Sequence, residues 1–220
     1  FGRTSPTDAN APDAHTFVRL NSLSKLFAGE VLATLIDQHA LRLGDGLQQH
    51  APRGGLVPVA RNGRAITLRD LVIHTSGLAR DVPVSVWDTG APKEARWKWL
   101  ARTKLQHVPG LTAEYSNAAW LFLGDAMEEA TRTSYPELLA RHVLSPLALS
   151  DTTLAPTAAQ CARLLSAGPV RCDPMQVTAP SWGIYSTPAD VARWLQALMS
   201  APPGGTMHRS LTDLAKRTDL

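Results

Sequence analysis

The 220-residue chain lacks the features that mark nucleic-acid-binding, membrane-spanning and disordered proteins. Its basic residues are scattered and its formal net charge is only +3, too weak for a nucleic-acid-binding surface. Its longest apolar stretch before a glycine, Ala118 to Leu123, is far shorter than the roughly 20 residues of a membrane-spanning helix. Hydrophobic residues make up 44% and charged residues 19%, which predicts a folded protein with a sizeable core.

Motifs for metals and cofactors are also missing. The sequence has no His-Glu-x-x-His, no Gly-x-Gly-x-x-Gly and no Gly-x-x-x-x-Gly-Lys, so we expect neither a metal nor a cofactor. Its two cysteines, Cys161 and Cys172, do not form a Cys-x-x-Cys pair, and two thiols alone do not make a zinc site. Their spacing leaves two alternatives open, a disulfide that closes a short loop or two buried free thiols.

Apolar residues at helical spacing predict a strong first helix. It is expected to start around Ser22 to Ser24 and to run to about His39. Residues 16–20, just before it, are expected to be a short strand or an extended lead-in. Residues 145–186 are expected to be mostly loop. The apolar positions of the first helix are Leu26, Val31, Leu32, Leu35 and Ile36.

Capping patterns predict where later helices begin. Thr67 and Asp70 have the spacing of a capping box, and Gly77 is expected to end that short helix. Thr187 followed by Pro188 predicts the start of the last helix. Other helices are expected over residues 94–102 and 118–131 and from residue 134.

Ser22 and Lys25 form a Ser-x-x-Lys motif at the start of the first predicted helix. Residues three apart share a helix face, so Lys25 can reach the Ser22 hydroxyl. The electropositive helix N-terminus favours an alkoxide and disfavours the lysine ammonium, which suits a nucleophile and its base. The alternative is a serine cap followed by a solvated lysine.

Tyr115, Ser116 and Asn117 stand just before another predicted helix. A tyrosine there could share a proton with the Ser–Lys pair, and the asparagine side chain could bind a substrate amide as donor and acceptor. The alternative is a helix-entry loop in which Asn117 is the cap and Tyr115 packs. His74 has two interpretations, as the base of a triad or as a structural residue at a helix end, and the second is favoured.

These motifs resemble the penicillin-recognising serine enzymes. The Tyr-x-Asn form of the second motif looks like the branch that holds class C β-lactamases, DD-peptidases and esterases. Residues 66–78 (ITLRDLVIHTSGL) and 183–190 (GIYSTPAD) are similar to signatures of that branch. Residues 97–100 (WKWL), with the two cysteines, look closest to AmpH-type D-alanyl-D-alanine carboxypeptidase/endopeptidases.

The resemblance implies a role for each motif residue. Ser22 would be the acylated nucleophile, with its backbone N–H as one oxyanion donor. Lys25 would be its proton partner, Tyr115 the general acid/base and Asn117 a contact to the substrate amide. Cys161 and Cys172 would be paired, because enzymes of this type are periplasmic and disulfides persist in the periplasm.

The resemblance also implies an α+β fold of the β-lactamase/transpeptidase type, with a helical domain and an antiparallel sheet. The third motif of such enzymes, Lys/His-Thr-Gly on a strand, follows the Tyr-Ser-Thr helix and is not found before Leu220. We therefore expect residues 1–220 to be a single catalytic region that is incomplete at both ends, with terminal strands largely missing. An uncovered apolar face on the first helix would then favour a homodimer.

The expected function is that of a serine hydrolase that acts through an acyl-enzyme on D-Ala-D-Ala peptides of peptidoglycan and binds or hydrolyses β-lactams. A class C-like β-lactamase and a small-ester esterase are alternatives that use the same residues. A non-catalytic binding protein that retains the fold is an alternative of another class. The expected location is the periplasm, after removal of an export signal that this chain does not contain.

Overall fold

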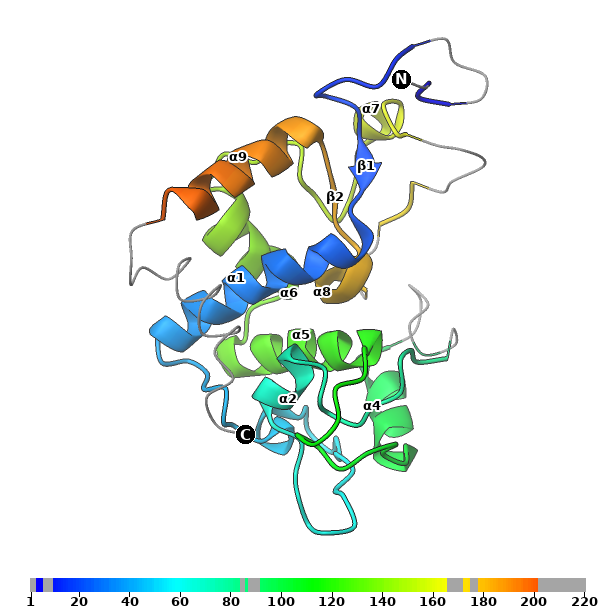
Figure 1. Ribbon diagram of the computed structural model, residues 1–220, viewed down its shortest axis with the longest axis vertical. Helices are drawn as coiled ribbons and strands as arrows, with labels where there is room; N and C mark the ends of the chain where they lie inside the picture. The colour runs from blue at the N-terminus through cyan, green and yellow to red at the C-terminus, as the bar shows by residue number, and fades with distance from the viewer. Residues whose placement is uncertain are drawn as a thin grey trace.

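The computed structural model describes residues 3–5, 10–83, 86, 92–165, 172–174 and 178–201. Over these residues, the fold consists of eleven helical elements and one small sheet (Figure 1). The strands β1 (Val18–Arg19) and β2 (Tyr185–Ser186) pair antiparallel, with Val18 opposite Ser186. The predicted α+β class, dominated by helices, is confirmed. The helical elements are η1 (Asn21–Leu23), α1 (Ser24–Asp37), η2 (Leu47–His50), α2 (Leu68–Val72), α4 (Lys93–Arg102), α5 (Asn117–Thr131), α6 (Tyr135–Leu139), η3 (Ala140–Leu144), α7 (Ala158–Cys161), α8 (Ala179–Trp182) and α9 (Pro188–Met199).

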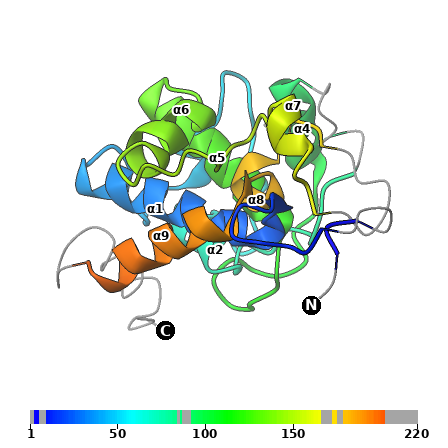
Figure 2. The ribbon, with the colours of Figure 1, turned by 90° about the horizontal axis from the view of Figure 1, so that it is seen from above.

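Helix α1 runs through the middle of the fold, between α9 and α5 (Figures 1 and 2). Phe27 of α1 stacks on Trp194 of α9 with 4.7 Å between ring centroids, and Val31 and Leu35 are also buried. Leu26, one of the apolar positions that predict this helix, is 48% exposed. Since neighbours surround most of α1, its hydrophobic periodicity does not define a single inward face.

Side-chain caps fix the starts of several helices, as the sequence predicts. Thr67 and Asp70 form a capping box at α2, and the Thr187 hydroxyl accepts the Asp190 N–H at α9. At α5 the cap is Ser116, whose Oγ accepts the Ala119 N–H at 3.0 Å. The interpretation of Asn117 as this cap is therefore wrong.

The end of α2 differs from the prediction. The helix stops at Val72, five residues before Gly77, and His74 adopts a left-handed backbone with φ 61°. Gly77 also has positive φ, 72°, but it serves a close approach of two loops, since a Cβ there would collide with the His107 carbonyl. Histidine is among the few non-glycine residues that occupy the left-handed region with some frequency.

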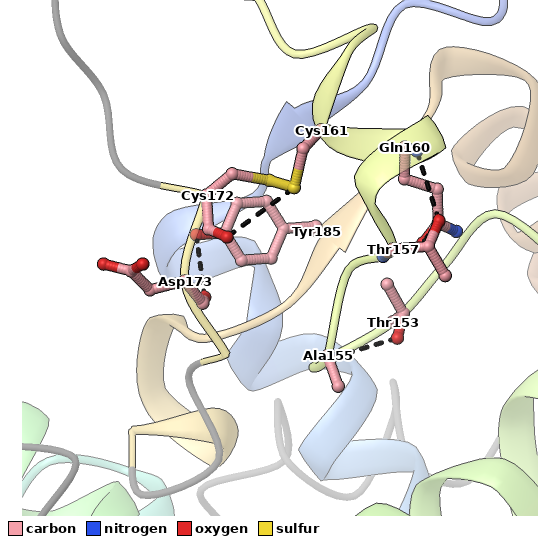
Figure 3. The surroundings of a disulfide bond; sticks show 8 residues. All are labelled: Thr153, Ala155, Thr157, Gln160, Cys161, Cys172, Asp173 and Tyr185. Atoms are coloured by element: carbon pink, nitrogen blue, oxygen red, sulfur yellow. Dashed lines mark hydrogen bonds between the residues drawn. A yellow bond between two sulfur atoms is a disulfide. The ribbon is translucent and has the colours of Figure 1, made fainter.

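A second small cluster lies beside the sheet. Phe17 stacks on Tyr185, with 5.5 Å between centroids, and Cys172 packs against them. Cys161 and Cys172 form a disulfide, and Figure 3 shows the Tyr185 ring next to it. The structure thus selects the bridged alternative over two free thiols. Over the described ranges, no helix is long and apolar enough to cross a membrane.

Candidate active site

Ser22 and Lys25 stand where the chain enters α1. Asn21, with φ 49°, turns the chain into the short η1 helix, and the buried Ser24 Oγ accepts the Ile184 N–H at 3.1 Å. The Ser22 side chain is exposed and caps no helix, whereas Lys25 is only 6% exposed. The alternative of a capping serine and a solvated lysine is therefore excluded.

The structure brings Tyr115 onto Ser22 across 93 positions of sequence. The Tyr115 hydroxyl lies 2.7 Å from Ser22 Oγ, and Lys25 Nζ lies 3.4 Å from the same oxygen. Lys25 Nζ also stands 5.0 Å from the centroid of the Tyr115 ring. The three groups that the two motifs supply therefore share one site, and the shortest contact of the serine is with the tyrosine.

The Lys25 ammonium is held by two further acceptors. Its Nζ donates to Asn117 Oδ1 at 2.8 Å and to the Ser181 carbonyl at 2.9 Å. Ser181 belongs to α8, which lies at the N-terminal ends of α1 and α5 (Figure 1). Sequence reasoning missed Ser181, because it forms part of no motif and contributes its backbone.

Asn117 connects the lysine to a loop that the sequence did not single out. Its Nδ2 donates to Asp81 Oδ1 at 2.7 Å, and its backbone N–H donates to the Arg80 carbonyl at 2.7 Å. The exposed Arg80 guanidinium lies 5.1 Å from the centroid of the Tyr115 ring. The positive charge of Arg80 and the negative charge of Asp81 therefore both lie next to the site.

The surroundings lower the pKa of both proton-carrying groups. Burial is the main cause of the lowered pKa of Lys25, opposed by Tyr115 and Asp81. Burial by itself raises the pKa of Tyr115, but the adjacent Lys25 and Ser22 and the positive charges of Lys25 and Arg80 bring it below its usual value. For Tyr115 the shift is toward the phenolate, the form that can accept a proton.

His74 contacts the tyrosine of this arrangement and the residue that follows it. Its ring stacks on Tyr115, with 4.5 Å between centroids, and its Nδ1 accepts the Ser116 N–H. The histidine thus contacts the tyrosine loop and is more than a helix end. Within the part of the chain that the structure describes, no group of three or more His, Cys, Asp or Glu side chains could hold a metal ion.

Comparison with known families matches residues 1–219 to the family described as "Beta-lactamase". Among curated proteins, D-alanyl-D-alanine-carboxypeptidase/endopeptidase AmpH of Escherichia coli strain K12 is 40% identical over 210 residues, which cover 91% of this chain and 54% of that protein. This chain thus spans about half the length of that curated relative.

Solved structures share the fold. A β-lactamase/D-alanine carboxypeptidase from Yersinia pestis, complexed with citrate, is 36% identical with a TM-score of 0.88, over 96% of this chain and 62% of that one. A class C β-lactamase has a TM-score of 0.79 at 22% identity, over 96% of this chain and 58% of that one. The second likeness extends to the fold alone.

Proposed function

The chain belongs to the β-lactamase family, and on that premise we propose that it is a serine hydrolase with Ser22 as the acylated nucleophile. The observation that carries the proposal is the 2.7 Å contact between Ser22 Oγ and the Tyr115 hydroxyl, beside the buried Lys25. An exposed serine with a proton acceptor in hydrogen-bond reach has the geometry of an activated nucleophile.

In the proposed acylation step, Ser22 Oγ attacks the substrate carbonyl carbon while its proton passes to the Tyr115 oxygen. The Lys25 ammonium stabilises the tyrosinate that accepts this proton, which accounts for the lowered pKa of Tyr115. As the tetrahedral intermediate collapses, the carbon–nitrogen bond breaks and Tyr115 protonates the leaving nitrogen. Water then attacks the acyl-enzyme, and the same proton transfers release the acid and restore Ser22.

Asn117 would serve both the lysine and the substrate. Its Oδ1 accepts from Lys25 and, at 3.2 Å, from Ser181 Oγ, so the acceptor end of the amide is occupied. Its Nδ2 carries two hydrogens, and one of them is donated in a hydrogen bond to Asp81 Oδ1. The second hydrogen is left for the carbonyl of a substrate amide.

The proposed substrates are peptides that end in D-Ala-D-Ala, as in peptidoglycan, with β-lactams as acylating analogues. Support comes from the AmpH relative and the Yersinia pestis structure, whose names state carboxypeptidase activity. A periplasmic location agrees with the Cys161–Cys172 disulfide, since disulfides persist in oxidising compartments.

A labelled penicillin tests the nucleophile. Mass spectrometry of the digested adduct should place the label on the peptide that contains Ser22, and S22A should remain unlabelled. S150A, at another exposed serine, serves as the matched control and should be labelled like the wild type. Release of D-alanine from a D-Ala-D-Ala peptide, assayed in parallel, tests the substrate class. Label on another serine, or none with a correctly folded protein, would contradict the proposal.

A further inference from the structure

His74 takes part in no step of the proposed reaction, yet it contacts Tyr115 and both residues that flank it. Its ring stacks on the Tyr115 ring at a centroid distance of 4.5 Å and an interplanar angle of 30°. Its carbonyl accepts the Glu114 N–H at 2.8 Å, and its Nδ1 accepts the Ser116 N–H at 3.0 Å. Both neighbours of Tyr115 along the chain are thereby bound to one histidine.

The contact with Ser116 requires an uncharged histidine. A backbone N–H can only donate, so His74 Nδ1 must be the unprotonated nitrogen and any ring proton sits on Nε2. Protonation at Nδ1 would set two donors against each other. It would also add a positive charge near the Lys25 ammonium and to a ring stacked on Tyr115, where the Arg80 guanidinium already lies.

We propose that His74 is a positioning residue that holds Tyr115 on Ser22 only while its imidazole is neutral, so that its protonation switches the site off in acid. This inference rests on the proposed function. The left-handed backbone at His74, φ 61°, fits such a role, because unusual backbone conformations of non-glycine residues cluster at functional sites.

The direction of the pH effect follows from the surroundings of His74. Burial, and then the charge of Lys25, lower the pKa of His74, against a smaller opposing effect of the Ser116 hydrogen bond. The neutral form therefore persists below the pH at which an ordinary histidine is half protonated. Acylation should be intact above that range and lost as the pH falls through the lowered pKa.

H74N is the informative variant. Asparagine tolerates a left-handed backbone, and its Oδ1 can accept the Ser116 N–H, but it neither stacks as an aromatic ring nor titrates. We expect kcat/KM for acylation at neutral pH to fall by up to about 10²-fold, as for a misplaced catalytic group. The fall in acylation rate that the protonation of His74 causes in acid should disappear. Any fall that remains in H74N should come from other groups and lie at lower pH.

H39N is the matched control, because His39 also has a left-handed backbone, φ 57°, and is exposed at the end of α1. It should change neither the rate nor the acid limb. In a Y115F background, H74N should cost little further, because the two residues would act through one hydroxyl. An unchanged acid limb in H74N, or full additivity with Y115F, would overturn the proposal.

A measurement without catalysis separates this inference from the proposed function. The chain has three tyrosines, so ¹³C labelling of the ring carbon that bears the hydroxyl (Cζ) gives three NMR signals, and Y115F assigns the signal of Tyr115. In the wild type, this signal should shift as the pH falls through the titration of His74, and in H74N it should not. If the wild type is never acylated but its Tyr115 signal shifts, the proposed enzyme function is refuted and the role of His74 is not. If the Tyr115 signal does not change with pH, the proposed effect of His74 protonation is refuted.

Discussion

Removal of the Tyr115 hydroxyl is the sharpest test of the shared proton site. Y115F deletes the oxygen that lies 2.7 Å from Ser22 Oγ and leaves the ring that stacks on His74. The ring also keeps its place beside the charges of Lys25 and Arg80. The variant therefore removes a proton carrier while it preserves most of the packing of the loop.

The expected loss follows from the proposed role of that hydroxyl as a general acid/base. A positioned general acid/base contributes about 10²- to 10⁴-fold in rate, which corresponds to roughly 3 to 5 kcal/mol of activation free energy. Acylation of Y115F by a chromogenic β-lactam, followed by stopped-flow absorbance, should slow by that factor. K25A should slow acylation by at least about 10²-fold, and K25A/Y115F should be little slower than the worse single variant, because cooperating groups are not additive.

Y135F is the matched control for the same substitution. Tyr135 is fully buried, and its hydroxyl has no hydrogen-bond partner among the residues that the structure describes. Y135F should acylate at the wild-type rate, with a free energy of unfolding unchanged or higher by about 1 kcal/mol, because an unsatisfied polar group is lost. Near wild-type acylation by Y115F, or full additivity with K25A, would refute the shared role of Tyr115 and Lys25.

Two further predictions concern stability. Replacement of both Cys161 and Cys172 by serine should lower the free energy of unfolding by about 2 to 3 kcal/mol, since the disulfide closes a loop of 11 positions, and urea titration with and without reductant checks this. D125A should lower the free energy of unfolding by about 3 to 5 kcal/mol, because Arg96 would remain buried without its carboxylate partner. In the wild type, Arg96 Nε donates a hydrogen bond to this carboxylate at 2.7 Å. Thermal unfolding of D125A beside D125N measures the loss. A loss below 1 kcal/mol in D125A would contradict the expected cost of leaving Arg96 buried without a carboxylate partner.

Local chemistry explains why several helix starts could be predicted. The Thr67–Asp70 capping box and the Thr187 cap join residues three apart, so they need no distant partner. The prediction that α2 ends at Gly77 is wrong, because His74 takes the left-handed conformation before Gly77 and the sequence does not show this. That choice depends on the loop around Tyr115, to which His74 binds.

The sequence by itself determined that Ser22 and Lys25 lie together, because residues three apart on a helix are neighbours whatever the rest of the chain does. Its motifs also indicated the family, which the comparison confirmed. Only the tertiary structure decided that the Tyr115 hydroxyl meets Ser22 and that the Ser181 carbonyl holds Lys25. These contacts join residues that are 93 and 156 positions apart in the sequence, and no local propensity encodes them. They arise because α1, α5 and α8 bury their apolar surfaces together, which brings the ends of these helices to one place.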